Sequence, residues 1–200
     1  MPSKYKLPEG INFTFETERL LIRPLEEKDR EFYISLYTDA KIMRHICEPF
    51  TLEQADKAFN ATLKAMNKAV ETLNAMTMTW IVDDIESTQS FGIMSVDFRN
   101  RNINVVKQKL THAGCCEFGI ILMQQSHGKG LPNEAIIGLA KFTLTYFKVA
   151  RIYCTYNKKN LAVSRFIKKI GFVKPTEIIS LNSGTEYQYL PIDWLKNLIN

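Results

Sequence analysis

The chain has 200 residues, of which 46% are hydrophobic and 24% are charged. A chain of this length and composition can bury its own hydrophobic core as one domain, and the composition excludes a disordered chain, a collagen-like repeat and a coiled coil. Lys and Arg number 26 against 21 Asp and Glu, which gives a formal net charge of +5. This mild basicity favours an anionic ligand but is too small to indicate nucleic-acid binding.

The cysteines are Cys47, Cys115, Cys116 and Cys154. Adjacent cysteines rarely bridge each other and no C-x-x-C pair is present, so we expect reduced thiols in a cytoplasmic protein. No Cys and His cluster has the spacing of zinc ligands, and no metal is expected. The first ten residues are polar and charged, and no uncharged apolar run approaches about 20 residues. We therefore expect neither a signal peptide nor a membrane partner.

The N-terminal half begins with a segment rich in breakers. Residues 1–16 are predicted to form a leading arm, because two prolines and a glycine interrupt them. A strand is predicted over residues 20–22 and a helix over residues 29–37. Thr51 and Gln54 form a capping-box pattern that begins a long amphipathic helix, predicted to run to about residue 74.

The middle of the chain has the composition of strands. Residues 79–82 and 90–98 are predicted to pair as a hairpin across a polar turn. Residues 100–113 are polar and predict a loop. The apolar run over residues 116–123 predicts a central strand, since short continuous apolar runs are typical of buried strands.

The C-terminal third alternates helices and strands. A helix is predicted after Gly130, and a short helix over residues 163–170 ends at Gly171. The predicted strands are residues 150–156, 177–181 and 186–190, the last two joined by a hairpin turn. This order predicts an α/β (α+β) domain around one mixed, mostly antiparallel sheet, with parallel pairing around the crossover helix.

The most informative segment runs from Gln125 to Gly130, between the predicted central strand and the next helix. Two glycines one residue apart allow a tight turn and a close backbone approach. The following helix offers unpaired N–H groups and the positive end of its dipole, so the loop can cradle a pyrophosphate. It is not a dinucleotide-binding fingerprint, because Asn133 stands where a third glycine is needed, and no Gly-Lys-Ser/Thr makes it a Walker loop.

Q-x-x-G-x-G between a strand and a helix resembles the acetyl-coenzyme A signature of the GNAT N-acetyltransferases. Residues 17–25, 117–120 and 160–172 resemble segments of the branch typified by the RimJ/RimL-like ribosomal-protein N-terminal acetyltransferases. The resemblance covers about residues 17 to 190. It implies a GNAT fold of about six to seven strands flanked by about four helices, as a single domain over residues 17–200.

The resemblance implies acetyl-CoA as the cosubstrate, with no metal. Backbone N–H groups of the glycine loop would hold the pyrophosphate, and the pantetheine arm would lie along the central strand like an additional strand. Asn160 would bind the arm or brace the site. The implied coenzyme-binding residues are Ile120, Ile121, Leu122, Met123, Gln125, Gly128, Lys129, Gly130, Leu131 and Asn160. Lys158, Lys159, Lys168 and Lys169 could meet the ribose phosphate or form a solvated surface.

The implied reaction is direct attack of an amine on the thioester, without a covalent enzyme intermediate. It needs a neutral amine, a stabilised oxyanion and a proton for the leaving thiolate. The oxyanion donor would be a backbone N–H near Ile121 or Leu122. Glu117 is the predicted catalytic base, acting directly or through water; its alternative role is a structural bond to a neighbouring strand.

The proton donor departs from the family pattern. Val163 and Ile167 stand where relatives carry a serine or a tyrosine. Ser164, turned about 100° round the helix from Val163, is the substitute that we name as catalytic; water, or weak catalysis, are the alternatives. His127 is expected to be exposed and not catalytic. The region between the first two helices implies possible acceptor contacts at Met43, Arg44, His45 and Glu48.

The sequence therefore predicts an acetyl-CoA-dependent N-acetyltransferase, a monomer or homodimer. Its acceptor would be a peptide N-terminal α-amine or a small-molecule amine. An α-amine with a pKa near 8 is roughly a tenth neutral at pH 7, so a weak base suffices. The alternatives are a catalytically weak acyl-CoA-binding regulatory module, and a nucleic-acid-associated protein, for which the chain has no recognised binding motif.

Overall fold

The structure, a computed structural model, describes residues 9–73, 76–99, 114–126, 128–147, 149–175, 184–191, 193–194 and 197. Its centre is a seven-stranded sheet in which the strands lie side by side in sequence order. The strands are β1 (Phe15–Glu16), β2 (Leu20–Pro24), β3 (Thr77–Asp84), β4 (Ser90–Asp97), β5 (Gly114–Leu122), β6 (Val149–Asn157) and β7 (Thr185–Leu190).

All neighbouring strands are antiparallel except β5 and β6, which are parallel. A helix crosses over between these two, as a parallel pair requires. The mixed, mostly antiparallel sheet predicted from the sequence is thus confirmed, with β3 and β4 as its hairpin. The predicted loop over residues 100–113 and the predicted strand over residues 177–181 lie outside the described residues.

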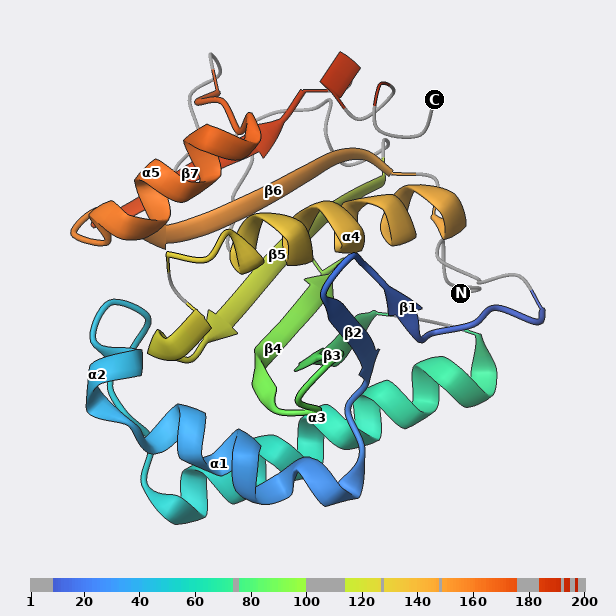
Figure 1. Cartoon of the computed structure of the whole chain (residues 1–200), viewed down its shortest axis with the longest axis vertical. Helices are drawn as coiled ribbons and strands as arrows, with labels where there is room; N and C mark the ends of the chain where they lie inside the picture. The colour runs from blue at the N-terminus through green and yellow to red at the C-terminus, as the bar shows by residue number, and fades with distance from the viewer. Residues whose placement is uncertain are drawn as a thin grey trace.

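Helices cover both faces of the sheet (Figure 1). α1 and α3 lie on one face, α4 lies on the other, and α5 lies beside β6 and β7. The helices are α1 (Arg30–Thr38), α2 (Ala40–Met43), α3 (Leu52–Thr72), α4 (Leu131–Tyr146) and α5 (Leu161–Ile170), with short 3-10 turns at Glu27–Asp29 and Gln124–Ser126. The sequence did not predict α2, because four residues are too few to show a helical period.

Local signals set the ends of the helices where they were expected. At the start of α3 the Thr51 N–H donates to Gln54 Oε1 (2.9 Å) and the Gln54 N–H donates to Thr51 Oγ1 (3.2 Å), which completes the predicted capping box. α5 ends at Gly171, whose φ of +113° favours glycine.

The alternation of β3 divides the core between the two faces. Met78, Trp80 and Val82 pack on the α4 side, whereas Ile81 packs with Tyr33 and other residues under α1 and α3. Each such fully buried side chain contributes about 1.5–3 kcal/mol by leaving water.

The predicted N-terminal arm contributes to this core within its described part. Phe13 is buried, and its carbonyl accepts a hydrogen bond from Trp80 Nε1 at 2.8 Å. Phe15 and Glu16 form the edge strand β1, so the arm from residue 13 onward packs on the sheet.

A buried charge cluster fixes α1 against the sheet. Arg23 on β2 donates to Asp83 on β3 (2.7 Å) and, through two nitrogens, to Asp29 just before α1 (2.8 Å each). The hydrogen bonds to Asp29 are the main reason that the pKa of Arg23 lies above its ordinary value. The Glu26 N–H also donates to Asp29, so the cluster joins β2, β3 and the turn into α1.

We predict that Arg23→Met lowers the free energy of unfolding by about 3 kcal/mol, because Asp29 and Asp83 would stay buried without their cation. Urea unfolding measures the loss. Arg30→Met is the matched control, since Arg30 also lies between two acids, Glu27 and Asp56, but near solvent. An equal loss in both variants would contradict this role of the buried cluster.

Candidate functional site

The site is built around a gap between β5 and β6. Among the described residues the two strands pair only from Gly114 with Val149 to Glu117 with Tyr153. Beyond that, β5 stays paired with β4 up to Leu122, and β6 stays paired with β7 up to Asn157. The strands therefore come apart toward the side where α2 and α5 lie (Figure 1).

A cavity of about 630 Å³, called here the first cavity, passes through this gap. Phe118 and Ile120 line it from the α4 side of β5, and Gly119 and Ile121 line it from the α1 side. Its volume is in the range of small-molecule sites.

The free edge of β5 is a row of main-chain groups. The Met123 N–H donates to the Phe91 carbonyl of β4 at 2.8 Å. Because main-chain groups alternate along an antiparallel strand, Ile121 also turns its N–H toward β4, whereas Ile120 and Leu122 turn theirs toward the gap. Of the two predicted oxyanion positions, only Leu122 thus offers its N–H to the gap.

A second cavity, of about 500 Å³, continues from the gap to the glycine loop. Gly128 and Gly130 line it, both with φ of +78°, a conformation that glycine adopts without strain. Gly130 is the N-cap of α4, so the positive dipole end of that helix faces the cavity. Within its first turn, Pro132 has no N–H, and the Asn133 N–H donates to the Gly130 carbonyl at 3.1 Å.

An ion pair between the turn before β2 and α4 stabilises the glycine loop. Arg19, on the turn before β2, donates to the Lys129 carbonyl at 3.0 Å and, through two guanidinium nitrogens, to Oε2 of Glu134 on α4, at 2.8 and 2.6 Å. Thr17 donates to the same carboxylate at 2.6 Å. Burial alone would raise the pKa of Glu134, but these hydrogen bonds outweigh it and lower the pKa. Glu134 is therefore ionised, and the paired Arg19 balances its negative charge beside the loop.

α5 forms the opposite wall. Asn160 caps this helix, since its Oδ1 accepts from the Val163 N–H at 3.1 Å. Asn160, Val163 and Phe166 line both cavities.

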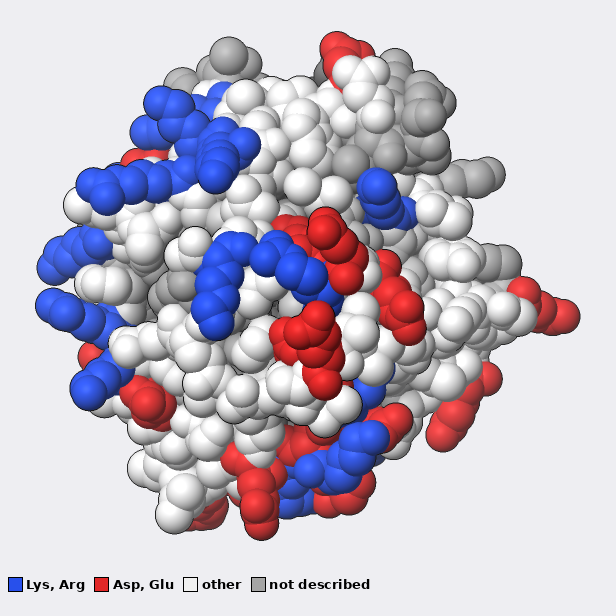
Figure 2. All heavy atoms as spheres, in the orientation of Figure 1, with Lys and Arg blue, Asp and Glu red and all other residues white. Residues whose placement is uncertain are grey.

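Basic side chains surround this part of the molecule. Figure 2 shows Lys and Arg gathered on the side where α5 and α2 lie in Figure 1. The exposed basic residues of these two helices are Lys41, Arg165, Lys168 and Lys169, of which Lys41 and Lys169 line the second cavity. Their charge complements an anionic ligand.

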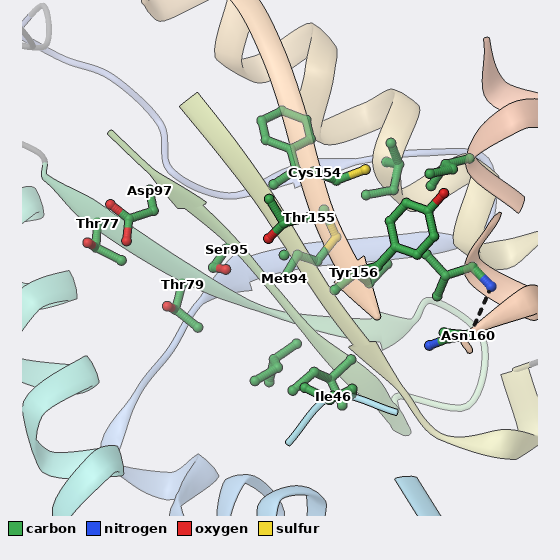
Figure 3. Close-up of a pocket in the computed structure, with 18 of the residues that line it drawn as sticks. Ile46, Thr77, Thr79, Met94, Ser95, Asp97, Cys154, Thr155, Tyr156 and Asn160 are labelled. Atoms are coloured by element: carbon green, nitrogen blue, oxygen red, sulfur yellow. Dashed lines mark hydrogen bonds between the residues drawn. The ribbon is translucent and has the colours of Figure 1, made fainter. Parts of the chain in front are cut away.

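On its α1 side, the first cavity is polar. Thr77 and Thr79 of β3 and Ser95 and Asp97 of β4 point from adjacent strands into this space (Figure 3). Arg99 forms a bidentate ion pair with Asp97, in which Nε donates to Oδ1 at 2.9 Å and a terminal guanidinium nitrogen donates to Oδ2 at 2.5 Å. Hydroxyl groups and one carboxylate are suited to a polar, hydrogen-bonding acceptor.

Glu117, the predicted base, lies one hydrogen bond behind the cavity wall. It sits on β5 opposite Asp97 and Tyr153, and Thr155 Oγ1 donates to its Oε1 at 2.5 Å. Thr155 lines the first cavity, whereas Glu117 is absent from the described lining of both cavities. The geometry suits a carboxylate that reaches the cavity through the Thr155 hydroxyl.

The thiol and phenol next to Glu117 stay protonated at neutral pH. Burial, and secondarily the charge of Glu117, raise the pKa of Cys154 to about 12 and that of Tyr153 well above its ordinary value. A protonated thiol is a poor nucleophile, so Cys154, which lines the first cavity, does not favour covalent catalysis. All four cysteines are free.

The structure brings some of the predicted site residues together and leaves others out. Those that line a cavity are Ile120, Ile121, Leu122, Gly128, Gly130 and Asn160. Those that line neither are Met123, Gln125, Lys129, Leu131 and Ser164. Leu131 is buried in the core, and Gln125 is exposed while its neighbour Gln124 lines the second cavity. His127 lies outside the described residues.

Several lining residues were missed by sequence reasoning. Lys41 and Ile42 belong to α2, which gave no helical signal. Phe166 lies in the predicted helix over residues 163–170 and Ala162 just before it, and neither side chain has a distinctive chemistry. Ile46, in the loop after α2, lines both cavities, as does its neighbour His45, which the sequence analysis named as a possible acceptor contact. A basic residue on the predicted connection between the first two helices was the one signal that could have pointed to Lys41.

Residues 19–173 match the family described as acetyltransferase (GNAT) domain. The chain belongs to the GNAT acetyltransferase family. It is therefore an acetyltransferase, and its glycine loop and gap correspond to the segments on which the sequence resemblance rested. No curated protein sequence matches this GNAT acetyltransferase significantly.

Solved structures share the fold of this GNAT acetyltransferase. A GNAT-family acetyltransferase from Bacillus anthracis is 22% identical with a TM-score of 0.66, over 90% of this chain and 99% of the other. Spermidine N-acetyltransferase from Vibrio cholerae, in complex with CoA and spermine, is 19% identical with a TM-score of 0.64, over 89% and 98%. An aminoglycoside acetyltransferase in complex with coenzyme A is 14% identical with a TM-score of 0.70, also over 89% and 98%.

Within the described residues, no group of three or more His, Cys, Asp or Glu side chains is placed to hold a metal ion. Nor does any helix in this part of the chain have the length and apolarity needed to cross a membrane. That the reaction needs no metal stays a prediction.

We predict that Gly128→Ala weakens CoA binding about tenfold, because an L residue at this φ costs about 1–2 kcal/mol and the loop would shift to relieve it. Calorimetric titration with CoA measures the change. Gly10→Ala is the matched control, since Gly10 has the same φ of +78° and the same open space but lies outside both cavities. Equal CoA affinity in both variants would contradict a role of the loop conformation.

Proposed function

We propose that this protein transfers the acetyl group of acetyl-CoA to a primary amine. The observation that carries the proposal is that the two cavities meet at the gap between β5 and β6. The second cavity is bordered by the glycine loop, and the first cavity has a polar wall. A thioester lying in one cavity and an amine lying in the other would meet at the free edge of β5.

The lining and the charge of the second cavity are suited to coenzyme A. The glycine loop and the start of α4 would take the pyrophosphate, and Lys41 and Lys169 would meet the phosphates. The pantetheine arm would lie along Ile120 to Leu122, whose outward main-chain groups are suited to pair with its amides. The solved GNAT relatives with CoA bound support this assignment.

The acceptor is a protein or peptide N-terminal α-amine or a small-molecule amine. The names of two fold relatives, which act on spermidine and on aminoglycosides, support an amine. The motif at residues 17–25 supports the RimJ/RimL-like branch and hence a peptide N-terminus. The hydroxyl-rich wall with Asp97 supports a small polar amine. We propose a cytoplasmic location, in keeping with four free cysteines, and a monomer or homodimer.

In this proposal the protein supplies two groups to the chemistry. The Leu122 N–H, turned to the gap, donates to the oxygen of the thioester as negative charge develops there. Glu117 receives the proton that an ammonium must lose before it attacks, through the Thr155 hydroxyl. An acceptor with a low pKa suits this arrangement, since a carboxylate is a weak base.

The test is an assay of a panel of amines with acetyl-CoA, in which a colorimetric thiol reagent measures the release of CoA. The panel contains N-terminal peptides, polyamines, aminoglycosides and lysine side-chain peptides. We expect at least one amine to release thiol, and Glu117→Gln to lower kcat/KM for that amine by about 100-fold at pH 7.

Thr155→Val is the companion variant, because it removes the hydroxyl that joins Glu117 to the cavity and should lower kcat/KM by a similar factor. Tight binding of CoA without thiol release for any amine would overturn the enzymatic proposal. That result would favour the catalytically weak acyl-CoA-binding module.

A further inference from the structure

The gap lacks a proton donor on α5. Val163 and Ile167 line the first cavity with hydrocarbon, and Ser164 lies outside the lining of both cavities. A thiolate leaving from acetyl-CoA in this gap would still need a proton. The donor is therefore either water or a side chain of another element.

The two cavities share a wall, which marks where an amine and a thioester could meet. The described residues in both linings are His45, Ile46, Ile120, Ile121, Asn160, Val163 and Phe166. Within that set, His45 is the only side chain that titrates. Imidazole is also the side chain best matched to proton transfer near neutral pH.

Contacts on both sides of His45 hold its loop in place. On the N-terminal side Met43 is fully buried, and its carbonyl accepts from the N–H groups of Ile46 (2.8 Å) and Cys47 (3.2 Å). On the C-terminal side the Phe50 N–H donates to the Tyr37 carbonyl at 2.9 Å, and the two rings stack with centroids 5.2 Å apart. His45 itself is half-buried, so the loop presents it to the cavities from a fixed backbone.

Other acidic hydrogens near the gap are less suited to the task. Burial raises the pKa of Tyr37 well above its ordinary value, which makes its hydroxyl a weaker acid, and Tyr156 borders only the first cavity. Burial raises the pKa of the Cys154 thiol to about 12, which makes it a weak acid. All three line the first cavity alone.

We propose that His45 is a catalytic residue that moves the proton from the attacking nitrogen to the sulfur of CoA. The inference rests on the proposed function. As the C–N bond forms, the imidazole takes the proton that the nitrogen must lose. As the C–S bond breaks, the imidazolium gives that proton to the thiolate, so His45 ends each cycle neutral and the products are the N-acetyl amine and CoA with a free thiol.

The test compares His45→Gln and His45→Ala with wild type, using the amine found by the panel. We expect kcat to fall about 100-fold while the KM for acetyl-CoA changes less than about threefold, because the lost step is proton transfer rather than binding. Free imidazole in the buffer should restore about tenfold of the lost rate in His45→Ala. Cys47→Ser is the matched control, with an unchanged kcat expected, since Cys47 is exposed on the same loop and lines neither cavity.

The outcomes separate the two claims. Thiol release at an unchanged kcat in both His45 variants would overturn this inference and leave the proposed function intact. A lower kcat with no response to imidazole, together with weakened CoA binding, would assign His45 to binding and would also overturn it. A wild-type protein that releases no thiol with any amine would overturn both.

Discussion

Strand β5 stays paired with β4, and β6 with β7, along their whole lengths beyond the point where β5 and β6 separate. Among the described residues, β5 and β6 pair with each other only from Gly114 with Val149 to Glu117 with Tyr153. Two twisted halves of a sheet can satisfy their outer pairings and still part in the middle, provided that something else fills the gap. The freed main-chain groups of Ile120 and Leu122 then need a partner, since unpaired N–H groups are costly to bury. A ligand with amides of its own would meet that need, which is the role proposed here for coenzyme A.

The elements around the gap between β5 and β6 are held in place by contacts of their own. The Arg19–Glu134 pair and the positive φ of Gly128 and Gly130 fix the loop at its outer end. The buried cluster at Arg23 fixes α1, whose end leads into α2 and the His45 loop. The gap, the loop and the wall of α1 and α2 thus come from three separate parts of the chain, each stabilised on its own.

Much of this could be predicted from the sequence, for physical reasons. The capping box at Thr51, the apolar run of β5 and the glycine pair are local signals, and the structure confirms the elements that they predict. The relative positions of residues that are far apart in the sequence could not be predicted in this way. That the Leu122 N–H faces the gap while the Ile121 N–H faces β4 depends on the register with Phe91, and that His45 reaches the gap depends on how a short, aperiodic loop folds back. Neither has a local signature.

The central claim is that the free edge of β5 pairs with coenzyme A, and amide hydrogen exchange resolved by residue tests it most directly. On saturation with CoA, the account predicts that exchange slows about tenfold or more at Ile120 and Leu122, which face the gap, and changes little at Ile121, which is already paired with β4. Tight binding of CoA with no change at Ile120 and Leu122, or with equal slowing at all three amides, would contradict it.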